Sequence, residues 1–177
     1  MDIPKQLLLR EIEAEDNVNG LSLGNAESTP LKIFLRKCAK DFHRVNVARS
    51  YVLVPDSQKP RVWGYMTLMC SEIKLGNSHC VDDCEAATRY NDFPAVKIAR
   101  LAVDQHIRKR GYGEAMVQFA ISIAKQDVMP RIGCRFLIAE AKPGAMSFYK
   151  KVGFTQLDTA KNRSRKLPVV FLDLHKL

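Results

Sequence analysis

No stretch of this sequence is apolar for long enough to cross a bilayer, which takes about 20 consecutive apolar residues. The first fifteen positions carry only the run Leu7 to Leu9 before acidic residues begin, so no secretory signal is expected either. We therefore expect a cytoplasmic protein without a membrane partner. Internal repeats and low-complexity tracts are also missing. A hydrophobic content of 46% in 177 residues predicts a single domain, residues 1–177, with a core of its own.

Cysteine is too scattered to form a disulfide framework. The chain has five cysteines, an odd number, which suits a reducing compartment. His79, Cys80 and Cys84 lie close together in the sequence, but they lack a second ligand pair and a regular zinc spacing. We expect free thiols in a loop here and no metal site.

A glycine-rich turn between an apolar stretch and a helical pattern is the most informative feature. The run from Ala95 to Val103 is mostly apolar and suits a buried strand. The turn reads Arg108-Lys109-Arg110-Gly111-Tyr112-Gly113. Apolar residues then recur at the spacing of an amphipathic helix, at Met116, Phe119, Ala120, Ile123 and Ala124. The predicted order is strand, glycine turn, helix.

Such a turn can bind an anion, because the first N–H groups of a helix lack intrahelical partners and lie at the positive end of its dipole. Gly111 and Gly113 let the main chain approach a phosphate, and the three basic residues before them add positive charge. A tight turn with a solvated basic face explains the same residues. A nucleotide P-loop would need Gly-Lys-Ser/Thr, and a dinucleotide fingerprint would need G-x-G-x-x-G; neither fits.

Three segments together resemble the GNAT superfamily of acyl-CoA-dependent N-acetyltransferases. They are the strand ARLAVD at 99–104, the turn RxxGxG at 108–113, and AMSFYKKVGF at 145–154. The resemblance implies an α/β (α+β) fold, with a mixed six- to seven-stranded sheet flanked by helices and with splayed central parallel strands. It also implies acetyl-CoA as the acetyl donor.

The same resemblance assigns the site residues. Backbone groups of Leu101, Ala102 and Val103 would pair with the pantetheine arm of the coenzyme. Nitrogens of Arg108, Lys109, Arg110, Gly111, Tyr112 and Gly113 would bind its pyrophosphate. Tyr149 would be the general acid that protonates the leaving thiolate, while an aromatic residue that only packs is the alternative. Glu140 is the nearest candidate base in the sequence, and Lys142 stands where many family members have asparagine.

A narrower resemblance links the chain to GNAT toxins of toxin–antitoxin modules, which acetylate aminoacyl-tRNA. Three segments carry it: the sequence IARLAVD at residues 98–104, the apolar pattern Leu31, Phe34, Leu35 and Ala39, and the sequence ARSYV at residues 48–52. It implies a tRNA substrate, a ribbon-helix-helix antitoxin and a homodimer. Two alternatives stay open: a GNAT enzyme acting on a small-molecule amine, a protein N-terminus or a lysine, and a non-catalytic module that binds nucleic acid.

The net charge is compatible with a polyanionic partner. Twenty-eight basic and nineteen acidic residues give +9, with basic clusters at 108–110 and 161–166. Coenzyme phosphates and solubility account for part of this charge in the alternative interpretation.

The remaining elements follow from local patterns. We expect a helix from Thr29-Pro30 to about His43, a helix from Pro143 to about Lys151 with a left-handed cap at Gly153, and a short helix near 84–88 within the polar stretch 74–94. Strands are expected at 6–12, 50–54, 61–71, 134–139, 154–157 and 168–174.

Overall fold

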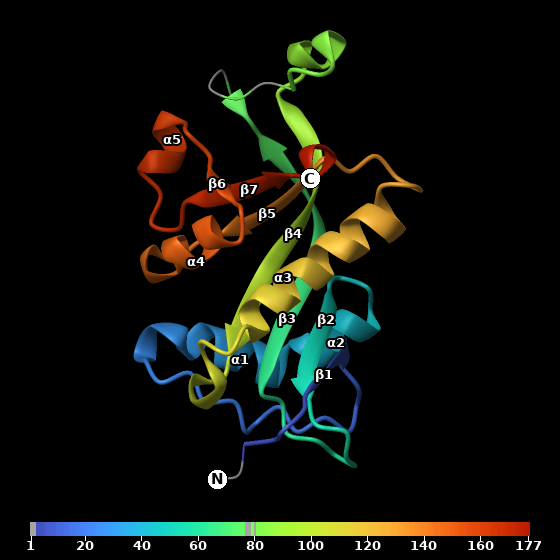
Figure 1. Cartoon of the computed structure of the whole chain (residues 1–177), viewed down its shortest axis with the longest axis vertical. Helices are drawn as coiled ribbons and strands as arrows, with labels where there is room; N and C mark the ends of the chain where they lie inside the picture. The colour runs from blue at the N-terminus through green and yellow to red at the C-terminus, as the bar shows by residue number, and fades with distance from the viewer. Residues whose placement is uncertain (1–2, 77–78, 80) are drawn as a thin grey trace. The chain divides into compact units, whose positions relative to one another are not determined.

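Seven strands form a mixed sheet in the part of the chain that the computed structural model describes, residues 3–76, 79 and 81–177. Their hydrogen-bonded order is β1-β2-β3-β4-β5-β7-β6 (Figure 1). The chain forms two compact units, which are described separately below. The first comprises Met1–Met69 and Ala99–Gln118, and the second comprises Cys70–Ile98 and Phe119–Leu177.

The elements alternate along the chain much as the apolar patterns predict. The strands are β1 (Leu8–Glu11), β2 (Arg49–Val54), β3 (Gly64–Lys74), β4 (Asp92–Val103), β5 (Phe136–Glu140), β6 (Thr155–Gln156) and β7 (Val169–Asp173). The helices are α1 (Thr29–Lys37), α2 (Ala39–Arg44), α3 (Tyr112–Ile123), α4 (Met146–Lys151) and α5 (Ala160–Arg163). Shorter helical turns are η1 (Ala26–Ser28), η3 (Glu85–Arg89), η4 (Gln105–Ile107), η5 (Ala124–Val128), η6 (Pro143–Ala145) and η7 (Leu174–Lys176).

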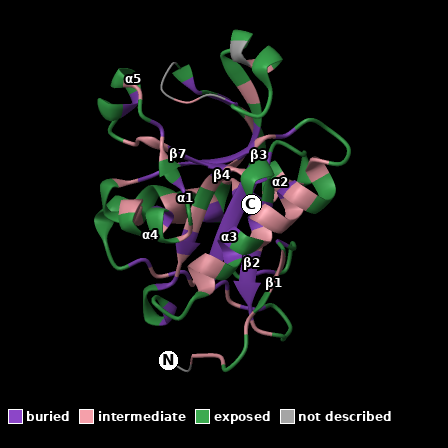
Figure 2. Ribbon diagram, turned by 45° about the horizontal axis from the view of Figure 1, so that its top comes forward, coloured by how far each residue is buried: buried purple, intermediate pink, exposed green. Residues whose placement is uncertain are grey.

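In the first unit, β1, β2 and the start of β3 form an antiparallel sheet that helices cover. β1 pairs with β2 from Leu8↔Val54 to Glu11↔Tyr51. The burial map shows β2 and the start of β3 mostly buried, whereas β1 is exposed or partly exposed and the helices have exposed outer faces (Figure 2). The core joins α1 and α2 to the strands through side chains that are almost fully buried: Leu35, Ala39, Val52, Val54, Val62, Tyr65 and Ala102.

One helix was expected from Thr29 to about His43, but the chain forms two, and this prediction is wrong. The break lies at Cys38, whose backbone (φ −125°, ψ −32°) leaves the helical region. Near the break, Phe34 packs on Tyr65, and the Tyr65 hydroxyl donates a 2.7 Å hydrogen bond to the Leu31 carbonyl. These tertiary contacts fix the direction of α1, and no local sequence signal reports them.

The start of α3 packs close to β3 because β3 begins with a glycine. A Cβ at Gly64 would lie 2.9 Å from Leu53 Cδ1, 3.0 Å from the Ala102 carbonyl oxygen and 3.4 Å from Met116 Cε. Met116 is fully buried. Only glycine therefore leaves room for this side chain of α3.

In the second unit, the predicted strands are confirmed with shifted ends. β4 pairs with β5 in parallel from Ala95↔Phe136 to Ile98↔Ala139, β5 pairs with β7 antiparallel, and β6 pairs with the same β7. The short helix expected near 84–88 is present as η3. Gly153 adopts φ +94° just past α4, which confirms the left-handed cap.

Helix α5 was not predicted, although Thr159 caps its start by accepting a hydrogen bond from the Asn162 amide. Its function is structural, because Asn162 is 2% exposed and holds three backbone groups. The side-chain Nδ2 of Asn162 donates to the carbonyls of Leu157 (2.7 Å) and Val169 (3.0 Å). Its side-chain Oδ1 accepts from the Val169 N–H (2.8 Å). This side chain therefore helps to hold the segment before β7 to that strand, together with the backbone hydrogen bond from the Leu157 N–H to the Val169 carbonyl (3.0 Å).

No helix within the described residues combines the length and apolar character that a membrane span requires.

Asn162→Ala should lower the free energy of unfolding by about 2–4 kcal/mol, because it leaves buried backbone groups without their partners. Denaturant unfolding measures the change. The exposed Asn91 provides a matched control, and Asn91→Ala should change stability by less than about 0.5 kcal/mol. Equal effects of the two substitutions would contradict the bridging role of Asn162.

Candidate active site

The turn between β4 and α3 changes the direction of the chain through two left-handed residues. Lys109 (φ +62°) and Gly111 (φ +83°) adopt left-handed conformations, which turn the chain sharply into α3. The Ala115 amide donates to the Gly111 carbonyl at 2.9 Å, so the amides before Ala115 precede the first hydrogen bond of the helix. A Cβ added at Gly111 would meet nothing within 4 Å, so the turn lies open on this side.

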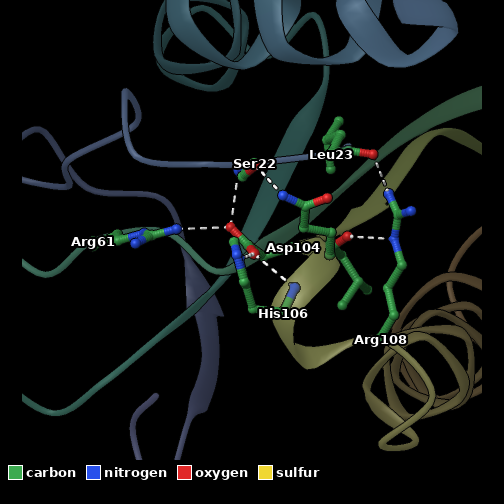
Figure 3. A network of polar contacts seen from close by, with 8 residues as sticks. Ser22, Leu23, Arg61, Asp104, His106 and Arg108 are labelled. Carbon is green, nitrogen blue, oxygen red and sulfur yellow. Dashed lines mark hydrogen bonds and ion pairs between the residues drawn. The ribbon is translucent and has the colours of Figure 1, made fainter. Parts of the chain in front are cut away.

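A buried carboxylate fixes the start of this turn (Figure 3). Asp104 follows β4 directly and is 0% exposed. Its Oδ2 accepts hydrogen bonds from Arg61 Nη2 and the Ser22 amide, both at 2.8 Å. Its Oδ1 accepts from the His106 amide at 3.0 Å and lies 2.7 Å from His106 Nδ1. Burial by itself raises the pKa of Asp104, but these hydrogen bonds outweigh it and hold the pKa below its ordinary value.

Arg108 uses its guanidinium to hold two backbone carbonyls, although the residue, like Lys109 and Arg110, is exposed. Its Nε donates to the Val103 carbonyl at 3.2 Å, and its Nη2 donates to the Leu23 carbonyl at 2.8 Å (Figure 3). The side chain therefore braces the turn, while Lys109 and Arg110 are exposed beside it. Sequence reasoning grouped the three basic residues together, and the structure gives Arg108 a different role from its neighbours.

Past its pairing with β5, the C-terminal part of β4 carries the three residues expected to bind the pantetheine arm. The parallel pairing ends at Ile98↔Ala139, and β4 continues to Val103. Leu101 and Val103 are partly exposed, whereas Ala102 is buried in the core of the first unit. Leu101, Ala102 and Val103 thus lie on the stretch of β4 that follows the last β5 pair.

Tyr149 lies on α4 in an aromatic environment. It is 6% exposed, and its ring meets those of Phe148 (5.3 Å between centroids) and Phe154 (5.2 Å) in edge-to-face contacts. Burial raises the pKa of Tyr149 to about 12. Its phenol is therefore protonated at neutral pH and available as a proton donor.

Glu140, the nearest candidate base in the sequence, is neutralised by two cations. Its Oε1 lies 2.6 Å from Arg165 Nη2 and 3.4 Å from Lys97 Nζ. To accept a proton from a substrate amine, this oxygen would have to leave its two cationic partners. The arrangement does not favour Glu140 as a general base.

Within the described part of the chain, no three His, Cys, Asp or Glu side chains are grouped so as to hold a metal ion. His79 accepts a hydrogen bond from the Asp158 amide through Nε2 (3.0 Å), and Cys84 is an exposed free thiol. Cys80 lies outside the described residues.

Comparison with known protein families decides to which family the chain belongs. The model of the acetyltransferase (GNAT) domain matches residues 68–156, which is half of the chain. The chain belongs to the GNAT acetyltransferase family. Acetyl-CoA is the acetyl donor of this acetyltransferase, as the three motifs predicted, and its fold is the predicted mixed sheet flanked by helices.

No curated protein matches the sequence of this acetyltransferase significantly. Solved structures do match its fold along nearly the whole chain. AtaT complexed with acetyl-methionyl-tRNAfMet has a TM-score of 0.82 at 22% identity, covering 97% of this chain and 96% of that one. A tyrosine-to-phenylalanine mutant of KacT has a TM-score of 0.80 at 25% identity, covering 97% of each chain. AtaTR bound with AcCoA has a TM-score of 0.74 at 23% identity, covering 96% and 94%.

Sequence reasoning missed the partners of Asp104 in this acetyltransferase. Ser22 and Arg61 reach it from distant parts of the sequence. No element was predicted around Ser22, and Arg61 is the first residue of the strand predicted at 61–71. The one available signal was a charged residue placed immediately after a buried strand, because such a residue needs partners.

Replacing Tyr149 with phenylalanine should remove a phenol that ionises only near pH 12. Because the folded pKa lies above the unfolded value of 10.0, this residue stabilises the fold below about pH 10, and that contribution is lost as the pH rises through about 12. The phenolate absorbance is measured against pH in wild type and in Tyr149→Phe, and the difference between the two curves is the ionisation of Tyr149. The subtraction removes the signal of Tyr65, because burial raises the pKa of that phenol as well.

The matched control is Tyr90→Phe, which removes a phenol that is 64% exposed. Tyr90→Phe should leave the ionisation of the Tyr149 phenol near pH 12 unchanged. A wild-type-minus-Tyr149→Phe difference that ionises near the ordinary tyrosine pKa would contradict the buried environment of this phenol.

Proposed function

We propose that this acetyltransferase transfers the acetyl group of acetyl-CoA to the α-amino group of an aminoacyl-tRNA, and that it acts as the toxin of a toxin–antitoxin module. The observation that carries the proposal is the fold match to AtaT with acetyl-methionyl-tRNAfMet. It spans nearly the full length of both chains and thus includes α1 and α2, which lie outside the residues matched by the family model.

In this proposal the turn after β4 binds the pyrophosphate of the coenzyme. The backbone nitrogens between Arg108 and Gly113 are the donors, and the positive end of α3 adds to their field. Lys109 and Arg110 supply exposed positive charge, while Arg108 contributes mainly by bracing the turn. The backbone of Leu101 to Val103 pairs with the pantetheine arm as an added strand would.

The reaction needs a neutral amine, a thioester and a proton donor for the leaving sulfur. The amine nitrogen attacks the thioester carbonyl, the new C–N bond forms and the C–S bond breaks. The thiolate takes a proton from the Tyr149 phenol, and the proton lost by the amine restores the phenol through solvent. Atoms balance as amine plus acetyl-CoA giving amide plus free coenzyme. The buried phenol suits this role because it is protonated at neutral pH.

An aminoacyl ester is a suitable acceptor for a site without a strong base. An α-amino group has a pKa of about 8, so a useful fraction is neutral at physiological pH. A lysine or a polyamine has a pKa above 10 and would need a base to remove its proton. Because Glu140 Oε1 is held in ion pairs with Lys97 and Arg165, an aminoacyl ester is the favoured substrate.

The partners follow from the same comparison. AtaT has been solved with the C-terminus of the antitoxin AtaR, and a KacTA–DNA complex is also known. By analogy, the partners proposed for this chain are a ribbon-helix-helix antitoxin that covers the site, and a second copy that forms a homodimer. Charged tRNA is found in the cytoplasm, which is the proposed location.

Purified protein incubated with charged tRNAs and labelled acetyl-CoA should place the label on the aminoacyl group. Tyr149→Phe should reduce the rate by about 100-fold or more, the range of general acid catalysis. Tyr90→Phe, which changes an exposed phenol, should retain the wild-type rate. Label appearing only on proteins or small amines would refute the tRNA substrate, and an unchanged rate in Tyr149→Phe would refute the role of that residue.

A further inference from the structure

We propose that Asp104 is a positioning residue for acetyl-CoA. Its side chain is fully buried, so it acts through other groups. It links the turn at residues 104–113 to the N-terminal segment Leu21–Gly24, a linkage that we call the clasp, and it holds both in the conformation that binds the pyrophosphate. The inference rests on the proposed role of the turn as the pyrophosphate site. It adds a residue that the family motif RxxGxG does not contain, and it assigns a function to the segment 21–24.

The four hydrogen bonds of Asp104 come from both sides of the clasp. His106, which belongs to the turn, supplies its backbone amide and a ring nitrogen to Oδ1. Ser22 and Arg61, which lie before β3 in the sequence, supply the two donors of Oδ2. Each carboxylate oxygen therefore faces a different part of the chain, and the side chain bridges them (Figure 3).

Further contacts extend the bridge along the turn. The Gln105 amide donates to the Ser22 carbonyl at 2.8 Å, and Gln105 Nε2 donates to Ser22 Oγ at the same distance. Arg108 reaches the Leu23 carbonyl at 2.8 Å. Gly24 adopts φ +74°, and a Cβ there would lie 2.3 Å from Gln105 Oε1. The left-handed backbone at position 24 favours glycine, and a side chain there would displace the end of Gln105 from its contact with Ser22.

The clasp ends where the anion-binding part of the turn begins. Residues 104 to 108 are anchored through Asp104, Gln105 and Arg108, and the fully buried Ile107 packs beneath them. Lys109 to Gly111 are exposed and carry the two left-handed conformations. The direction in which the following amides point therefore depends on the anchored part. A turn held in its bound conformation loses less entropy when the coenzyme binds.

The segment 21–24 also leads through η1 into α1. Coenzyme binding at the turn should therefore also order η1, the helical turn that precedes α1. The coupling is reciprocal, because any state that loosens the segment must weaken coenzyme binding by the same factor.

Asparagine at position 104 tests the proposal, because it keeps the shape of the side chain but places an NH₂ group against donors. Titration calorimetry should show acetyl-CoA binding to Asp104→Asn about 10-fold more weakly than to wild type, within the usual range of coupling between linked sites. Binding of S-acetylpantetheine, which lacks the pyrophosphate and the nucleotide, should be the same in both proteins. Calorimetry needs no acceptor, so the result does not depend on the tRNA substrate.

Asp16 provides a matched control. It is also a buried carboxylate of the first unit, and it pairs with Arg10 (2.6 and 2.9 Å) and the Glu13 amide (2.8 Å), none of which belongs to the turn. Asp16→Asn should therefore destabilise the fold while leaving the affinity for acetyl-CoA unchanged. Equal losses of affinity in Asp16→Asn and Asp104→Asn would overturn the proposal, because general destabilisation would then explain both.

Hydrogen exchange on the wild-type protein provides a test that does not depend on a folded variant. Acetyl-CoA should protect amides in peptides covering 21–25 together with those covering 104–113. Protection of the turn alone would overturn the clasp.

The calorimetry also separates the two levels of inference. Tight wild-type binding of acetyl-CoA with no loss in Asp104→Asn would overturn the positioning role and leave the pyrophosphate site in place. Wild-type binding of acetyl-CoA no tighter than that of S-acetylpantetheine would overturn the pyrophosphate site, and the positioning role with it.

Discussion

The turn between β4 and α3 depends on the complete pairing of one buried carboxylate. An ion of this kind inside a protein costs several kcal/mol unless its oxygens are hydrogen-bonded. Both oxygens of Asp104 accept two hydrogen bonds, and the donors come from three separate parts of the first unit. The same carboxylate thus contacts both the turn and the N-terminal segment, and a lost contact leaves one of its oxygens with one donor fewer. This constraint is what gives a short, exposed, glycine-containing loop a defined shape.

Sequence reasoning located the elements whose signals are local. The apolar run of β4, the glycine turn and the helical spacing of α3 each lie within a few residues, and so does the left-handed cap at Gly153. The break at Cys38 was missed because it depends on packing between α1 and β3. The roles of Ser22 and Arg61 were missed for the same reason. Their importance arises only when distant segments meet at Asp104.

The residue types at the site were predictable, but their chemical states were not. The motif around Tyr149 identifies a tyrosine, yet only its burial among aromatic rings shows that its pKa is raised to about 12. Glu140 could have been a base on sequence grounds alone. Its pairing with Lys97 and Arg165 changes that interpretation, because these ion pairs hold its Oε1 away from a substrate amine. The sequence shows which residue types occupy positions 140 and 149, but only the structure shows what surrounds their side chains.

The same distinction applies to the net charge of +9. Several of the cations that make up this total are engaged in internal contacts. Arg108 binds two carbonyls, Lys40 donates to the carbonyls of Ala14 and Asp16, and Arg165 pairs with Glu140.

A phosphate group near these side chains would have to compete with existing partners, whereas exposed cations such as Lys109 and Arg110 face solvent. These contacts leave the net charge unchanged, but they fix the positions of the cations that take part in them. Recognition of a large anionic substrate by such a surface relies on many weak contacts, each screened by salt, more than on one strongly basic cluster.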